Sequence, residues 1–69
     1  MTLFLQVKQC FVNAKNIHAM LQEYALQVTE EEVQSVFREA VTETEEVVEE
    51  LRKQLQELEH ELTNGSRFH

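Results

Sequence analysis

The sequence lacks the residues that end helices and the residues that cross-link small domains. Its 69 residues include no proline, a single late glycine, Gly65, and a single cysteine, Cys10. Without proline and with abundant Gln, Glu, Leu and Ala, the chain favours helices over strands. One cysteine cannot close a disulfide within the chain, so nothing indicates a disulfide-stabilised secreted domain. We therefore expect an all-α protein.

Long apolar runs and clustered basic residues are also missing. No run approaches the roughly 18 apolar residues of a membrane span, and the N-terminus has no signal-peptide pattern. Thirteen acidic residues, all glutamate, outnumber six basic ones and give a net charge of −7. The Lys and Arg are scattered, whereas a phosphate-binding surface needs them clustered, and the acidic balance disfavours anionic membranes. We expect a soluble cytoplasmic protein without a nucleic-acid partner and without direct membrane insertion.

The residue patterns of catalysis and metal binding are absent as well. There is no glycine-rich phosphate loop and no cysteine pair for zinc. Glu57-Leu58-Glu59-His60 has the Glu-x-x-His spacing of di-metal helical bundles, but Glu57 and His60 face away from the leucines that mark the inward side. Cys10 has no neighbouring base that would make it a nucleophile. We expect no enzyme, no catalytic residue, no cofactor and no metal.

Apolar residues recur at alternating spacings of four and three in both halves of the chain. The first row is Leu3, Val7, Cys10, Ala14, Ile17, Leu21, Tyr24 and Val28, and the second is Val33, Phe37, Ala40, Thr44, Val47, Leu51, Leu55, Leu58 and Leu62. Such heptad rows are typical of helices that pack together. They predict helices over about 2–27 and about 30–63, within a single domain of residues 1–64 that is followed by a flexible tail at 65–69.

The segment between these helices decides between a hairpin and one continuous helix. Thr29 and Glu32 have the spacing of a capping box, which predicts that a helix starts there, and Asn64-Gly65 predicts a stop. Because no Gly or Pro marks the turn, a single continuous helix is the alternative. We favour an antiparallel hairpin because the two rows then face each other in one register. That register pairs Tyr24 with Val33, Leu21 with Phe37 and Ala14 with Thr44.

Each helix also carries a second apolar row, which lies about 100° around the helix from its first row. Antiparallel helices advance in opposite senses, so both further rows fall on the same side of the hairpin. We predict that a second copy packs there and forms a homodimeric four-helix bundle, with a poorly covered monomer as the alternative. The predicted self-association residues are Phe4, Phe11, His18, Val41, Val48, Leu55, Leu58 and Leu62.

Another row repeats every seven residues nearly opposite the predicted hairpin contact. It consists of Leu5, Val12, Ala19 and Leu26. This candidate partner strip has three interpretations: scattered apolar surface, a higher-order contact, or a docking site for a partner helix. The second helix also carries most of the glutamates, which form either a solvated face or a strip for a basic partner or divalent ions.

The order of several short segments resembles a known family. Gln6-Val7-Lys8-Gln9, Ala14-Lys15, Tyr24-Ala25-Leu26-Gln27 and Phe37-x-x-Ala40-x-x-x-Thr44 are similar to the domain-of-unknown-function family numbered 1657, found in endospore-forming Gram-positive bacteria. Members are often encoded beside spore membrane proteins. The resemblance therefore implies a helical module without assigned activity, located in the forespore or spore, with a spore membrane protein as a partner.

Two hypotheses of function follow. The first is a non-catalytic, self-associating helical interaction module. The alternative is a helical bundle that binds a small ligand or a divalent metal, motivated by the glutamate-rich second helix together with His18 and His60.

Overall fold

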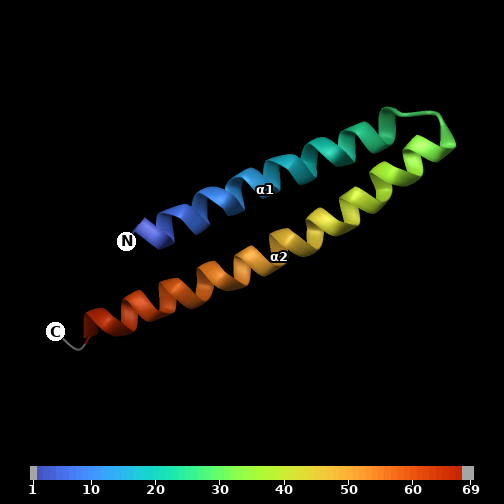
Figure 1. Cartoon of the computed structure of the whole chain (residues 1–69). Helices are drawn as coiled ribbons and strands as arrows, with labels where there is room; N and C mark the ends of the chain where they lie inside the picture. The colour runs from blue at the N-terminus through green and yellow to red at the C-terminus, as the bar shows by residue number, and fades with distance from the viewer. Residues whose placement is uncertain (1, 68–69) are drawn as a thin grey trace.

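The protein is an antiparallel hairpin of two long helices. The computed structural model describes the backbone of residues 2–67 and the side chains of residues 2–63. Helix α1, Thr2–Gln27, and helix α2, Glu31–Arg67, lie side by side and are joined by residues 28–30 (Figure 1). No strand occurs between residues 2 and 67. The prediction of an all-α hairpin is confirmed, and the alternative of one continuous helix is wrong.

The hairpin is a thin rod. It measures 59 × 15 × 13 Å between Cα atoms, and its radius of gyration is 16.4 Å, compared with about 11 Å for a globular chain of this length. Helix α2 is longer than α1 and extends past it at the end where both termini lie (Figure 1). Neither described helix has an apolar stretch long enough to cross a membrane.

The segment between the helices ends one residue later than the sequence predicts. The backbone N–H of Val28 donates to Tyr24 O at 3.0 Å, so Val28 still belongs to the last turn of α1. The first bond of α2 runs from Gln34 N to Glu30 O at 2.9 Å, which makes Glu30 the N-cap residue. The N-cap position therefore falls on Glu30 rather than on the predicted Thr29, because Val28 remains bonded to α1 and the chain reverses over the next two positions.

The Gln34 side chain links the two ends of the turn. Its amide Nε2 donates to Val28 O at 3.2 Å and lies 3.4 Å from Ala25 O. Carbonyl groups at the end of a helix have no partner within that helix and need an outside donor. Gln34 supplies this donor from the first turn of α2, and it thereby fixes where α2 starts relative to α1.

We expect Gln34→Ala to destabilise the hairpin by about 1 kcal/mol, because it removes a half-buried donor from two helix-end carbonyls. Gln54→Ala is the matched control, since Gln54 is exposed on the same helix. Chemical denaturation followed by circular dichroism measures both variants. Equal stability of the two would show that the Gln34 bonds contribute nothing.

The stop predicted at Asn64-Gly65 does not occur. Helix α2 continues through both residues to Arg67, past the predicted end at residue 63. A glycine ends a helix when it adopts positive φ, and no described glycine does so. In a helical conformation glycine costs only about 1 kcal/mol relative to alanine, which a long helix tolerates. Residues 68–69 of the predicted tail lie outside the described residues.

A continuous stripe of buried and half-buried side chains joins the two helices. Its members, here called the inner stripe, are Phe4, Val7, Phe11, Ala14, His18, Leu21, Ala25 and Val28 from the first half and Gln34, Phe37, Val41, Thr44, Val48, Leu51, Leu55 and Leu58 from the second. Each residue of the stripe on one helix faces a residue on the other, and the two residue numbers of such a pair always add to the same total. Two of these pairs, His18 with Thr44 and Val28 with Gln34, are hydrogen-bonded. One register therefore holds over the whole length.

This stripe differs from the predicted one in both face and register. Leu3, Cys10 and Ile17, which the sequence places in the contact, are exposed. The partner of Thr44 is His18 rather than Ala14, and Tyr24 rather than Leu21 lies against Phe37, with ring centroids 5.9 Å apart. The inner stripe contains Phe4 and Phe11 where the predicted row has Leu3 and Cys10, and the larger aromatic side chains gain more from burial.

Candidate functional site

The middle of the hairpin is held by a hydrogen bond between its helices. His18 Nδ1 lies 2.9 Å from Thr44 Oγ1, and the same hydroxyl lies 2.9 Å from Ala40 O and 3.0 Å from Val41 O. A hydroxyl has one proton, and these carbonyl oxygens can only accept it. The hydroxyl oxygen then accepts a bond from His18, so Nδ1 carries the ring proton in this contact.

We expect Thr44→Val to destabilise the hairpin by about 1 kcal/mol, because the half-buried His18 donor loses its acceptor while the side-chain shape is kept. Thr42→Val is the matched control, since the Thr42 hydroxyl bonds only to Arg38 O within its own helix. Thermal unfolding distinguishes the two variants. A loss as large for Thr42→Val would assign the effect to the change of residue type rather than to the His18 bond.

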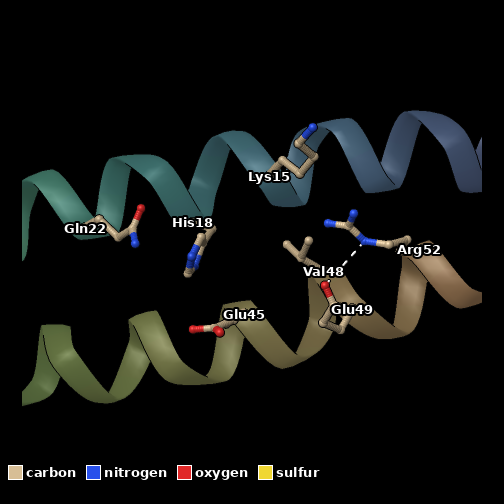
Figure 2. A pocket seen from close by; sticks show the side chains of 7 residues that line it. All are labelled: Lys15, His18, Gln22, Glu45, Val48, Glu49 and Arg52. Atoms are coloured by element: carbon tan, nitrogen blue, oxygen red, sulfur yellow. Dashed lines mark ion pairs between the residues drawn. The ribbon is translucent and has the colours of Figure 1, made fainter.

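Cationic side chains gather on one flank of the hairpin. Lys15 Nζ lies 5.3 Å and the Arg52 guanidinium carbon 5.5 Å from the centroid of the Phe11 ring, and Arg52 Nε pairs with Glu49 Oε2 at 3.3 Å. Lys15 comes from α1 and Arg52 from α2, so this flank includes both helices (Figure 2). The two cations cover Phe11 on its solvent side. We call this side the charged flank.

A shallow groove follows the charged flank. It is lined by Lys15, His18, Gln22, Glu45, Val48, Glu49 and Arg52 (Figure 2). The groove contains no hydroxyl or thiol nucleophile, and the nearby Thr44 hydroxyl is held by backbone carbonyls. Nowhere in the described part of the chain do three or more His, Cys or Glu side chains come together to hold a metal ion. The groove is a polar surface lined by side chains from both helices.

The structure places the predicted self-association residues mainly inside the hairpin. Seven of the eight belong to the inner stripe, and Val48 is only 7% exposed. The eighth, Leu62, lies near the C-terminal end of α2 and is exposed. For Phe4, Phe11, His18, Val41 and Val48 the expected position on an outer flank is wrong, because these side chains meet the other helix of the same chain. Leu55 and Leu58 also belong to the row predicted at the helix contact, and they lie there. The burial of these residues does not test whether the protein associates with itself, so self-association stays a prediction.

The predicted partner strip lies on the surface. Leu5, Val12, Ala19 and Leu26 are all exposed, and Leu26 at 86% is the most exposed of the large apolar side chains described. Leu26 borders a small groove formed with Gln34 and Arg38 near the turn. The strip belongs to α1 alone, since the residues that lie beside it on α2 are polar or charged. Glu57 and His60 are likewise exposed on α2.

The largest group of exposed apolar side chains lies on the flank opposite the charged one. We call it the apolar face. It consists of Leu3, Cys10, Ile17 and Tyr24 on α1 and Val33, Ala40 and Val47 on α2. Ala40 is half-buried and the other six are exposed. The sequence pattern identifies these residues as apolar rows but assigns them to the interior. The same error in the rotation of α2 explains why Gln34 is missed. Thr44 is predicted at the helix contact and lies there, but with Ala14 rather than His18 as its predicted partner.

A comparison with known families identifies the hairpin. The model of the family described as "Protein of unknown function (DUF1657)" matches residues 7–62. The chain belongs to the DUF1657 family. The match includes most of both helices, so the DUF1657 unit is the hairpin itself, and the resemblance noted in the sequence is confirmed. No curated protein and no solved structure matches this DUF1657 chain. The family description names no activity.

Proposed function

We propose that this DUF1657 protein is a non-catalytic helical interaction module that associates with a second copy of itself. The observation that carries the proposal is the surface of the single chain. Its accessible area is 5657 Å², about 1,100 Å² more than the roughly 4,500 Å² expected for a folded monomer of its mass. The excess is similar to the about 800 Å² that each partner buries in a standard protein interface.

The interior of the hairpin supports the same proposal. Among the described side chains Val48 alone is buried, and none is fully enclosed. Ordering this many residues costs on the order of 1.5 kcal/mol each, which chains of this size offset with disulfides, metals or association. This chain has one cysteine, and its described residues form no metal cluster. Association is the remaining route, and a second hairpin would complete a four-helix bundle.

We expect sedimentation equilibrium at micromolar concentration to give the mass of a dimer. Helical content should fall on dilution, because the hairpin loses the surface that supports it. A chain that stays monomeric and fully helical, with cooperative unfolding that is independent of concentration, would refute the proposal.

The proposal for the cellular role depends on the family resemblance alone. Because the resemblance implies a spore-associated module, we propose a spore membrane protein as a partner and the forespore or spore as the location. Affinity capture from sporulating cells with solubilised membranes tests this part. Among the described residues, no arrangement favours the alternative of a bundle that binds a ligand or a metal.

A further inference from the structure

We infer that the second copy packs on the apolar face, with residues Leu3, Cys10, Ile17, Tyr24, Val33, Ala40 and Val47 at the interface. This inference rests on the proposed function and deepens it, because it assigns the association to one surface. That surface differs from the one the sequence pattern indicates.

The apolar face is continuous across both helices. On α1, Ile17 lies about 100° around the helix from His18 of the inner stripe, and on α2, Val47 has the same offset from Val48. Because the helices are antiparallel, equal offsets fall on the same side of the hairpin. The opposite offset, taken from Ala14 and Leu51 of the inner stripe, leads to Lys15 and Arg52, which both reach the Phe11 ring on the charged flank. The two apolar rows therefore lie together on the other side.

Charge separates the two flanks. None of the seven residues of the apolar face carries a charge, and the α2 row that continues it adds Gln54 and, near the end of the helix, Glu61. The rows on the charged flank hold six charged residues and one glutamine: Lys8, Lys15, Gln22, Arg38, Glu45, Arg52 and Glu59. Removing ionised groups from water is costly, whereas removing apolar groups is favourable. The apolar face is the side of the hairpin that a partner can cover at little electrostatic cost.

The size of the apolar face suits a small dimer. From Leu3 to Tyr24 it runs about 32 Å at 1.5 Å per residue, and the hairpin is 15 Å wide between Cα atoms. Two such faces together cover about 1,000 Å², the lower bound for a specific interface. The candidate partner strip is narrower, because it occupies a single helix.

Charge also determines how a second copy would lie on the apolar face. Residues 30–62 contain twelve glutamates against Arg38, Arg52 and Lys53, whereas α1 contains Lys8 and Lys15 against Glu23. A two-fold axis along the hairpin places α1 of each copy over α2 of the other, with both turns at the same end. The helix with a slight positive balance then lies on the strongly acidic one, and the two acidic helices lie diagonally apart. The other face-to-face arrangement places α2 of one copy over α2 of the other, and repulsion between the glutamates of the two helices would oppose it.

The test compares two pairs of glutamate substitutions by sedimentation equilibrium. Ile17→Glu/Val47→Glu places two charges on the apolar face, where the side chains are 50% and 49% exposed. We expect it to raise the dimer dissociation constant by about 100-fold or more, as for residues at the centre of an interface. Val12→Glu/Leu26→Glu is the matched control on the partner strip and should leave the dissociation constant within a few fold.

The outcomes separate this inference from the proposed function. A wild-type chain that is monomeric refutes both. A wild-type dimer that Val12→Glu/Leu26→Glu dissociates, or that neither pair weakens, leaves the proposed function standing and overturns the apolar face as its site.

A second measurement avoids any loss of folding in the variants. The Cys10 thiol is exposed in the single chain and lies on the apolar face. In the wild-type protein, its alkylation by excess iodoacetamide should slow as the chain concentration passes through the dissociation constant. In Cys10→Ala/Val12→Cys, with the thiol on the partner strip, the rate should stay constant. Wild-type alkylation that does not change with concentration overturns the inference.

Discussion

Val48→Arg is expected to unfold the hairpin, while Val36→Arg leaves it folded. Val48 is the most enclosed side chain described, and it points from α2 toward α1 (Figure 2). An arginine there is too long for the space between the helices. The guanidinium would reach solvent along the charged flank, beside the two cations Lys15 and Arg52 that line the groove there. Overpacking and an unpaired cation together cost at least about 3 kcal/mol.

That cost is large for a chain of this size. A stability of 0.05–0.15 kcal/mol per residue gives about 3 to 10 kcal/mol for the whole hairpin. Val36 is a fair control because it is the same residue type on the same helix and is 62% exposed. Both substitutions also reduce the net negative charge equally. Circular dichroism at 222 nm with urea titration measures the difference, and similar midpoints for the two variants would contradict the assignment of Val48 to the core.

Phe11→Ala is expected to destabilise the hairpin by about 2 kcal/mol, roughly half the loss for a fully buried phenylalanine. The Phe11 ring is half-buried in the inner stripe and is covered by Lys15 and Arg52. Its removal exposes the contact between α1 and α2 near Val48 and takes away the ring that both cations approach. The adjacent Val12→Ala is the control, since Val12 is exposed on the partner strip.

Phe11→Leu separates packing from the contacts with the cations. Leucine fills part of the same space but has no aromatic face, so we expect it to restore most of the stability lost in Phe11→Ala. Urea titrations of the three variants give the comparison. If Phe11→Ala were no worse than Val12→Ala, the ring would not belong to the core. If Phe11→Leu were as damaging as Phe11→Ala, the cation contacts would outweigh the burial.

The two helices can be predicted from local features of the sequence. Alternating spacings of four and three, together with the absence of proline, predict two helices, and the structure has them. The ends are less well predicted. Thr29 has the residue type of a cap, yet the capping position falls on Glu30, because the last turn of α1 keeps Val28. Gly65 has the residue type of a stop, yet it remains helical because nothing in its backbone requires positive φ.

The sequence does not decide which of the two apolar rows on each helix faces the other helix. Ile17 and His18 are neighbours in the chain, and either row could face the other helix. By residue type alone, Ile17 is the better core residue. The structure turns His18 inward because its ring has an acceptor in Thr44 and because the same rotation buries Phe11. The two choices differ by a helix rotation of about 50°, because Val7, Ala14 and Leu21 face the contact in both. This rotation depends on pairs of residues that are far apart in the sequence.

The sequence by itself determined that the chain is helical and that each helix has more apolar surface than a hairpin can bury, because periodicity and composition act within one helix. It favoured a hairpin over one continuous helix, and the structure decided between them. The tertiary structure alone decided which apolar row lies inside, which residues face each other and which flank stays exposed. Rotation and register depend on how large and polar side chains of one helix fit those of the other, and that fit is a property of the pair.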